Sequence, residues 1–345
     1  MTITNAEAIT ISEHLAAVPA FLGYMPADMI AVVFLRAGRV SMVIDVELDQ
    51  DRAGIAHHLA RLARQHDMDS VRILIIASTR HAGDALRMAD TIRDRQEFHG
   101  VTVGGYAYTH QLARGASYTD LLHHRDGIIP DPAATAAAVA TVTDGRIILP
   151  GRADYAASFI EQPAPSHEQF TAADHASARI GFNADVLARL ASAIADNEQP
   201  YPDLAARTAV LALDRDARAA LFGLALIDIR AAATLYTGIG NMLRGYQRAH
   251  MLAVAAVLYY VTGQGIASYE ATAHADDAAR AAHSALIHAD TEADTAPLGH
   301  TPELVRLMQT AHAHALPVEF VRNILAAGQI AATKFGIDTP EFGPA

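Results

Sequence analysis

The stretch LAAVPAFLGYMPADMIAVVFLRAGRVSMVIDVEL, residues 15–48, decides the fold of the N-terminal half of this chain. Its first part is apolar at helical spacing, and Gly23–Pro26 is a tight corner at which a helix can end. Residues 30–35 form an almost unbroken aliphatic run, as in a strand that is covered on both faces. Ala37–Gly38 then provides a turn, and the alternation within 40–48 predicts a second strand with one half-exposed face. The stretch therefore predicts a helix followed by a β-hairpin.

The helix that leads into this corner is expected to begin at Ser12, whose hydroxyl can cap it, and to continue to about Leu22. Pro19 lies inside the helix and should kink it or shorten its regular part, because proline has no amide proton to donate to the helical ladder. Gly23 is expected to end the helix, and Pro26 stiffens the turn that follows.

The next four elements alternate between helix and strand. By periodicity they are, in order, a helix, a strand, a helix and a strand over residues 51–66, 71–77, 83–98 and 101–108. Two strands joined through a helix form a βαβ unit with parallel strands and a right-handed crossover. The opening hairpin is antiparallel, so the sheet is expected to be mixed. Gly104–Gly105, inside the last of these strands, predicts a bulge or a close approach of another part of the chain.

The end of the front half is less regular. Residues 114–130 are polar and rich in Gly and His, and they predict a long loop. An Ala-rich helix is expected over 132–143, ended by Asp144–Gly145, and residues 147–149 are expected to form a last edge strand. We therefore expect residues 1–160 to form an α/β domain with a mixed sheet.

The back half shows helical periodicity and no strand pattern. Residues 161–169, EQPAPSHEQ, contain two prolines and few apolar side chains, which is typical of a linker. From 170 to 335 we expect an all-helical domain whose helices cover residues 171–196, 203–212, 214–225, 228–241, 245–262, 265–289, 301–314 and 318–333. Short joins favour antiparallel helix hairpins, although the spacing of the last helices also resembles a helical-repeat array.

The composition argues against several classes of protein. With 345 residues the chain exceeds one hydrophobic core, and its 51% hydrophobic content is too high for a disordered chain. The net charge of −12 and a single lysine, Lys334, argue against nonspecific nucleic-acid binding, although folding could still gather arginines into a local cluster. The absence of cysteine, of a signal-peptide pattern and of an apolar run long enough to span a bilayer predicts a cytoplasmic protein without membrane contact.

The strong sequence signatures of catalysis and metal binding are missing. HExxH, GxGxxG, GxxxxGK[ST] and GxSxG do not occur, so zinc-protease, dinucleotide, P-loop and α/β-hydrolase sites find no support, and we expect no cofactor and no metal. Three histidine pairs are spaced poorly for chelation on one helical face and are expected to be structural or solvated: His57–His58, His283 with His288, and His312 with His314. One acidic segment is expected to be a solvated loop around His274 and His288: Asp276, Asp277, Asp290, Glu292 and Asp294.

Ligands of α/β sheets bind beyond the carboxyl ends of parallel strands, and two such ends carry polar groups in this sequence. The residues that follow these two strands are Ser78, Thr79, Arg80 and His81 and, after the next strand, His110. Hydroxyls, a guanidinium and the free amides at the start of a helix could receive a small anion. The alternative is that Ser78 or Thr79 simply caps the following helix.

A second polar cluster lies in the predicted long loop, at His123, His124, Arg125 and Asp126. The loop could gather both imidazoles and Asp126 around one ion, or hold a histidine and Asp126 as a general-base pair. The alternative is a solvated surface loop in which Asp126–Gly127 makes a turn. The candidates for catalysis in this sequence are therefore His110, His123, His124 and Asp126.

Three short motifs resemble one family. They are Leu22-Gly23-Tyr24-Met25-Pro26-Ala27-Asp28, the segment from Gly145 through Leu149-Pro150 to Arg152, and Val261-Thr262-Gly263-Gln264-Gly265-Ile266-Ala267. The chain resembles, over about residues 10–330, an uncharacterised family of actinobacteria and their phages, domain of unknown function four-one-nine-two. It departs from that family at Met29, where a small hydroxyl residue is usual, and in its lack of the tryptophans common in the helical half. The resemblance implies a host in which cellular and phage copies both occur, and it implies no reaction.

Two functions remain open. The first is a non-enzymatic interaction or regulatory protein that binds a protein partner, or a second copy of itself, through the Ala-rich helices. The second is an enzyme that acts on a small anionic or phosphorylated substrate with Ser78–His81, His110 and residues 123–126 at the carboxyl edge of the sheet. Convergence of these residues in one pocket favours the enzyme, whereas a broad apolar patch on the helices favours the interaction.

Overall fold

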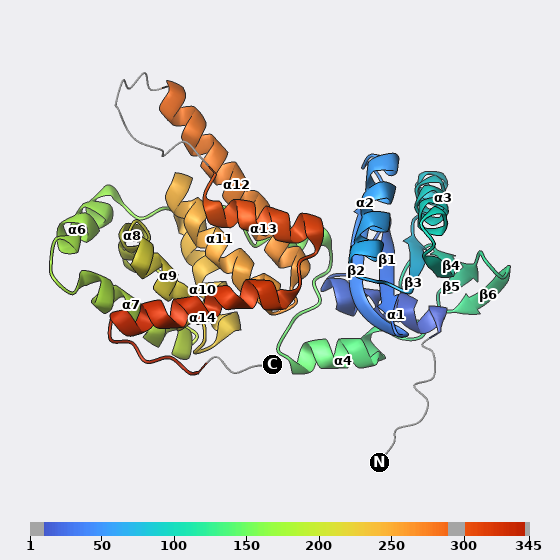
Figure 1. Cartoon of the computed structure of the whole chain (residues 1–345), viewed down its shortest axis with the longest axis horizontal. Helices are drawn as coiled ribbons and strands as arrows, with labels where there is room; N and C mark the ends of the chain where they lie inside the picture. The colour runs from blue at the N-terminus through green and yellow to red at the C-terminus, as the bar shows by residue number, and fades with distance from the viewer. Residues whose placement is uncertain (1–9, 289–300, 342–345) are drawn as a thin grey trace, which may run out of the picture. The chain divides into compact units, whose positions relative to one another are not determined.

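The computed structural model describes residues 10–288 and 301–341 of the chain. The chain divides into two compact units, Met1–Asp154 and Tyr155–Ala345, which we call the sheet unit and the helical unit. The first holds a mixed sheet with helices, and a helical region follows it, as the sequence predicts (Figure 1).

Six strands of the sheet unit form one sheet in the order β2-β1-β3-β4-β5-β6. Their bounds are Met29–Arg36 (β1), Arg39–Glu47 (β2), Ser70–Ile76 (β3), Thr102–Thr109 (β4), Ser117–Asp120 (β5) and Arg125–Ile128 (β6). Strand β1 runs antiparallel to both β2 and β3, whereas β3 and β4 are parallel. The predicted hairpin and the predicted parallel βαβ pair are both confirmed.

The helix before the corner is α1, Ile11–Leu22. Thr10 caps it in a capping box with Glu13, so the prediction that Ser12 is the cap was wrong. The helix continues through Pro19 to its predicted end, where Gly23 adopts a left-handed conformation with φ of 79°. The turn between β1 and β2 also follows the prediction, with positive φ at Ala37 and Gly38.

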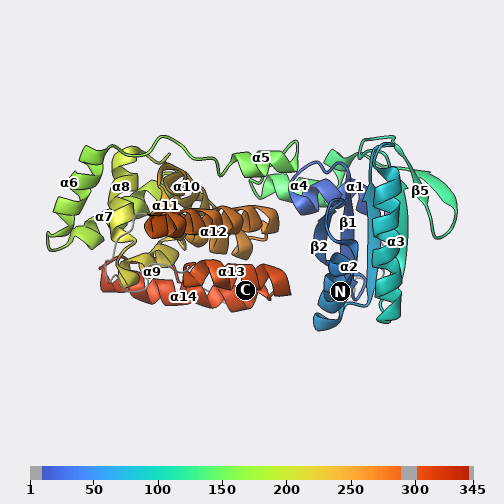
Figure 2. The same cartoon turned by 90° about the horizontal axis from the view of Figure 1, so that it is seen from above.

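Helices cover both faces of the sheet. Helices α2, Arg52–Gln65, and α3, Ala82–Phe98, lie side by side and bury one face in a cluster that includes Ile30, Ile73 and Met88 (Figures 1 and 2). Helix α1 packs with a short 3-10 turn, Pro132–Ala134, and with α4, Ala136–Thr143, on the other side. Seven of the eight residues of β1 are buried, which confirms that both of its faces are covered.

The glycines of β4 serve two purposes. The register of β3 and β4 shifts so that Gly104 is the extra residue of a bulge, as the sequence predicts. A Cβ atom on Gly105 would lie 3.0 Å from Cγ of Arg72 and 3.4 Å from Cγ1 of Ile11. Gly105 therefore leaves room for the Arg72 side chain, whose Nη1 lies 2.6 Å from Nδ1 of the buried His14.

Two predictions of secondary structure near the end of the sheet unit were also wrong. Residues 114–130 contain the hairpin of β5 and β6, which consists of four-residue strands too short and too polar to give a clear periodic pattern. Residues 147–149 form no edge strand, because Leu149 makes only one isolated bridge, with Tyr24. That bridge joins two of the motifs on which the family resemblance rests.

Most helices after residue 150 follow the predictions. Residues 152–157, however, form an unpredicted helix that crosses the boundary between the units, and residues 167–169 of the predicted linker are helical. The bounds are Arg152–Ala157 (α5), His167–Ser177 (α6), Phe182–Ala195 (α7), Pro202–Leu211 (α8), Arg215–Leu224 (α9), Ile229–Met242 (α10), Gly245–Val261 (α11), Gly265–His288 (α12), Glu303–His314 (α13) and Val318–Lys334 (α14). The one predicted helix over 171–196 is in fact two, separated at Gly181 with φ of 92°. Within the described part of the chain, no helix combines the length and the apolarity that crossing a bilayer requires.

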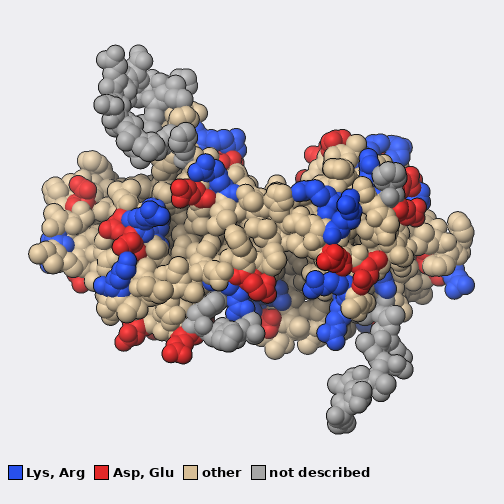
Figure 3. Space-filling model, viewed as in Figure 1, with Lys and Arg blue, Asp and Glu red and all other residues tan. Residues whose placement is uncertain are grey.

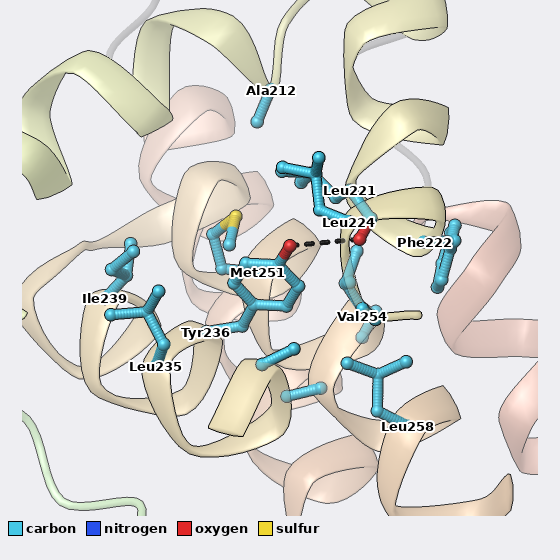
Figure 4. Close-up of a cluster of buried hydrophobic side chains, with 14 of the residues drawn as sticks. Ala212, Leu221, Phe222, Leu224, Leu235, Tyr236, Ile239, Met251, Val254 and Leu258 are labelled. Carbon is cyan, nitrogen blue, oxygen red and sulfur yellow. Dashed lines mark hydrogen bonds between the residues drawn. The ribbon is translucent and has the colours of Figure 1, made fainter. Parts of the chain in front are cut away.

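The core of the helical unit surrounds Tyr236, whose side chain is completely buried (Figure 4). Its hydroxyl donates a hydrogen bond of 3.0 Å to the carbonyl of Leu221, so the one polar atom of this side chain is satisfied in an apolar environment. Burial raises the pKa of this phenol well above its usual range. Leu235, Met251 and Val254 pack around the ring.

A buried arginine holds the segment before α6 against α10 and α11. The Arg248 side chain is 3% exposed, and its guanidinium donates to the carbonyls of Gly240 and Phe159. Asn241 adds a hydrogen bond of 2.8 Å to the carbonyl of Ser158. These bonds satisfy the carbonyl of Gly240 in the last turn of α10 and the carbonyls of Ser158 and Phe159 outside regular structure, which explains why a charged side chain is buried at this place.

Helices α9 and α14 approach so closely that only glycine fits at the contact. A Cβ atom added to Gly328 would lie 2.5 Å from Cβ of Phe222 and 2.6 Å from the backbone nitrogen of Gly223. A Cβ atom added to Gly223 would lie 2.5 Å from the carbonyl oxygen of Gly328. The backbones of the two helices are thus in direct contact at Gly223 and Gly328, so a larger residue there cannot be accommodated by rotating a side chain.

We expect Gly328→Ala to lower the free energy of unfolding of the helical unit by about 1–3 kcal/mol, because the added methyl group must push the two helices apart. The measurement is urea denaturation followed by circular dichroism. Gly265→Ala is the matched control, since an added Cβ there meets open space. Equal stability of Gly328→Ala and the wild type would contradict the close contact.

The buried His14 makes the stability of the sheet unit depend on pH. Burial, and then the charge of Arg72, lower the pKa of His14 to about 4. The unfolded imidazole binds a proton near pH 6.5, whereas the folded one does not until about pH 4. The stability that His14 contributes is therefore present above pH 6.5 and is lost as the pH falls towards 4.

We expect His14→Gln to remove up to about 3 kcal/mol of this pH dependence, at 1.36 kcal/mol per pKa unit. Hydrogen exchange of α1 peptides at pH 7 and pH 5 measures the change within the sheet unit. His57→Gln, at an exposed position of α2, is the control. If His14→Gln and the wild type lose protection equally between the two pH values, the imidazole is not buried in its neutral form.

Candidate functional site

Polar side chains gather where β1 begins and the parallel strands β3 and β4 end. Because β1 runs antiparallel to β3, Met29 pairs with Ile76, and Asp28 therefore lies beside Ser78. Helix α3 also starts at this edge, directly after His81. In open α/β sheets this is the edge at which ligands bind.

Asp28 is the centre of this group. Its Oδ1 accepts two hydrogen bonds of 2.8 Å from Ser78, one from the backbone amide and one from the hydroxyl. Its Oδ2 lies 3.0 Å from Nδ1 of His81. Asp28 adopts a left-handed conformation with φ of 52°, which is uncommon for a residue other than glycine and is found at functional sites.

The surroundings keep the Asp28 carboxylate ionised. Desolvation alone would raise its pKa, but the hydrogen bonds from the amide and hydroxyl of Ser78 and from His81 lower it overall. The carboxylate can therefore accept from His81 and hold the imidazole in one orientation.

Ser78 and Thr79 do not cap α3, so the capping interpretation was wrong. The N-cap residue of α3 is His81, and it makes no side-chain cap hydrogen bond. The Ser78 hydroxyl instead donates its proton to Asp28, because β1 places a carboxylate within reach. Ser78 thus donates a hydrogen bond to Asp28, and its hydroxyl is not activated as a nucleophile.

Tyr108 and His110 stand next to this group at the end of β4. The Tyr108 hydroxyl lies 3.0 Å from the carbonyl oxygen of Ala77 and 2.9 Å from Nδ1 of His110. The two rings meet edge to face with centroids 5.2 Å apart. Burial, and then the negative charge of Asp28, raise the pKa of Tyr108, so the phenol is close enough to sense that carboxylate.

The structure thus brings Ser78, His81 and His110 together around Asp28 and Tyr108. Two other candidates, Thr79 and Arg80, lie exposed in the turn that leads into α3. Sequence reasoning missed Asp28 and Tyr108 as members of the site. Asp28 stands in the corner motif, but only the antiparallel pairing of β1 with β3 shows which residues it faces.

The second candidate cluster does not join this edge. His123, His124 and Asp126 belong to the hairpin of β5 and β6, and the proposed turn at Asp126–Gly127 was wrong because both residues lie within β6. The turn is at residues 121–124, where His124 has a positive φ.

The strand direction explains this placement. Strand β5 runs back along β4, from the pair Thr109–Tyr118 to the pair Ala107–Asp120, so the turn lies towards the amino end of β4. His123 pairs there with Asp120 at 2.8 Å, and Asp126 accepts from Thr119 at 2.7 Å. Within residues 10–288 and 301–341, no group of three or more His, Asp or Glu side chains is arranged to hold a metal.

The corner motif also has contacts on the opposite face of the sheet. The hydroxyl of the buried Tyr24 donates to Asp45 at 2.9 Å, and Arg152 contacts the same carboxylate at 2.6 Å. Arg152 also lies 2.8 Å from Glu47. Burial, and then the charge of Asp45, raise the pKa of Tyr24. This group fastens the end of the sheet unit to β2 and has a structural role.

The remaining histidines and acids show structural contacts where they are described. His312 contacts Ser268 at 3.1 Å, and His274 stacks on Phe159. Asp276 and Asp277 lie within α12, where both pair with Arg280, so they do not form a loop. The rest of the predicted acidic loop lies outside the described residues: Asp290, Glu292 and Asp294.

Among the described residues of the helical unit, no single element stands out as a partner face. Their large exposed apolar side chains come from several parts of the chain: Ile160, Ile180, Tyr201, Leu213, Tyr269, Phe320 and Ile330. Acidic and basic side chains are interspersed over the face drawn in Figure 3. Binding of a protein partner or of a second copy through these helices stays a prediction.

We expect Asp28→Asn to cost the sheet unit about 1 kcal/mol, a low value for charged hydrogen bonds because the Asp28 side chain is 38% exposed. Hydrogen exchange of residues 78–85 should become faster, since the turn loses its charged acceptor. Asp94→Asn is the control, because this exposed carboxylate lies outside the measured segment, towards the other end of α3, and pairs with Arg93 at the surface. Unchanged exchange in Asp28→Asn would show that Asp28 does not order the turn.

Comparison with known proteins identifies a family for this chain but gives no activity. No curated protein and no solved structure matches this chain. A family model described as Domain of unknown function (DUF4192) matches residues 12–285, which cover the whole sheet and most of the helical unit. These comparisons do not test whether the host carries both cellular and phage copies of the family, so that expectation stays a prediction. The match includes both Asp28 and His81, and the chain belongs to the DUF4192 family.

Proposed function

We propose that the sheet unit binds a small anionic substrate at the carboxyl edge of β3 and β4, and that His81 acts on it as an acid–base group. The observation that carries this proposal is the 3.0 Å contact between Oδ2 of Asp28 and Nδ1 of His81. A carboxylate that holds one imidazole nitrogen leaves the other free to exchange a proton with a ligand.

The geometry supports general acid–base chemistry better than nucleophilic catalysis. The Ser78 hydroxyl is bound to Asp28, and it faces the same imidazole nitrogen, Nδ1, as the carboxylate does, at 3.3 Å. A serine nucleophile would need a nitrogen that is free to accept its proton. An attacking group, if the reaction has one, must therefore come from water or from the substrate.

Positive groups favour an anion at this edge. Arg80 is exposed beside His81, and α3, with 17 residues, begins without a side-chain cap on its free amides. The negative charge of Asp28 weakens the attraction for an anion, and three hydrogen bonds, two from Ser78 and one from His81, offset this repulsion only in part. Arg80 and the free amides of α3 must therefore supply the net attraction.

Titration with inorganic phosphate, followed by amide resonances, tests the proposal. We expect shifts at Ser78–Ala85, and we expect Arg80→Gln or His81→Gln to weaken binding about tenfold, as for the loss of one charged hydrogen bond. Arg93→Gln on the same helix is the matched control, because this side chain pairs with Asp90 and Asp94, more than two turns from the start of α3. Absence of shifts at Ser78–Ala85 in the wild type would refute the proposal.

A further inference from the structure

The hydroxyl proton of Tyr108 decides the protonation of His110. This hydroxyl has one hydrogen atom and two neighbours, the carbonyl oxygen of Ala77 at 3.0 Å and Nδ1 of His110 at 2.9 Å. The carbonyl can only accept, so the hydrogen atom must point to Ala77. Otherwise two oxygen atoms would face each other at 3.0 Å without a proton between them.

It follows that Nδ1 of His110 carries a proton and donates it to the Tyr108 oxygen. If Nδ1 carried none, it and the phenol oxygen would be two acceptors 2.9 Å apart. The neutral His110 ring therefore has its lone pair on Nε2.

The same comparison of hydrogen-bond donors and acceptors fixes the position of the proton on His81. Ser78 gives its hydroxyl proton to Oδ1 of Asp28, and the ionised Oδ2 can only accept. Nδ1 of His81, at 3.0 Å from Oδ2, must therefore be the donor. Two histidines from neighbouring strand ends thus share one tautomer, although their partners differ.

We infer that Tyr108 and Asp28 are positioning residues that set His110 and His81 in the Nδ1–H tautomer, so that both neutral rings offer Nε2 to a ligand as hydrogen-bond acceptors. This inference rests on the proposed function for its ligand, but the tautomers belong to the protein alone. Neither positioning residue needs to touch the ligand.

The pair of acceptors narrows the class of substrate. A bare anion has no proton to give to two Nε2 atoms, whereas hydroxyl groups do. The exposed guanidinium of Arg80 favours a negative charge on the same ligand. The ligand that satisfies both requirements is an anion that carries hydroxyl groups, such as a phosphorylated polyol.

Nitrogen-15 resonances of labelled histidine read the tautomers directly in the ligand-free protein at pH 8. We expect both rings to show a protonated Nδ1 and an unprotonated Nε2. In Tyr108→Phe only His110 should move towards the Nε2–H form, and in Asp28→Asn only His81 should do so. Tyr108→Phe keeps the ring that packs against the sheet core. A protonated Nε2 on either neutral ring of the wild type would overturn the inference.

Two probes of equal charge test the ligand class. We expect the wild type to bind glycerol 3-phosphate about tenfold more tightly than propyl phosphate, and Tyr108→Phe to lose most of this preference. Arg80→Gln should weaken both probes alike. Equal wild-type affinities would refute the hydroxyl requirement, whereas binding of neither probe would refute the proposed anion site. The tautomer measurement decides the positioning roles in either case.

Discussion

The Asp28 carboxylate accepts hydrogen bonds from a segment that follows it by fifty residues, and the candidate site depends on this contact. Three donors, two from Ser78 and one from His81, converge on one side chain that β1 brings to the edge of the sheet. The charge is stable there because each oxygen has a donor, and the left-handed backbone at Asp28 aims the side chain at the turn. The turn before α3 is thereby fixed without a helix cap of its own.

The corner from Gly23 to Asp28 links the two faces of the sheet. At one end, Tyr24 is buried against Asp45, and Arg152 closes the same carboxylate. At the other end, Asp28 faces the side on which α3 begins. A short rigid corner with a glycine and a proline can hold both positions at once. This corner is one of the three motifs on which the family resemblance rests. It makes structural contacts through Tyr24 and contributes Asp28 to the candidate site.

The helical unit is stabilised by close packing of small residues rather than by polar chemistry. Gly223 and Gly328 allow the backbones of α9 and α14 to come into contact. The buried hydroxyl of Tyr236 donates a hydrogen bond to the carbonyl of Leu221. Arg248, a polar group buried there, satisfies carbonyls at the end of α10 and in the irregular segment before α6. Nothing in these contacts presents a reactive atom to a ligand, which is why the sheet unit carries the proposed chemistry.

Local pattern in the sequence determined most of the helices, the first hairpin and the parallel βαβ pair, and it marked Gly104–Gly105 as a bulge or a close approach, because each depends on residues close together in the chain. It failed for the short polar strands β5 and β6, where four residues give no readable period. It also identified His81 and His110, since the ends of predicted strands are visible in a sequence. Only the tertiary structure decided which side chains face them, because strand order places Asp28 and Tyr108 beside them and turns the 123–126 cluster away. Hydrogen-bond partners distant in the chain follow from pairing across the sheet, and no local periodicity encodes that.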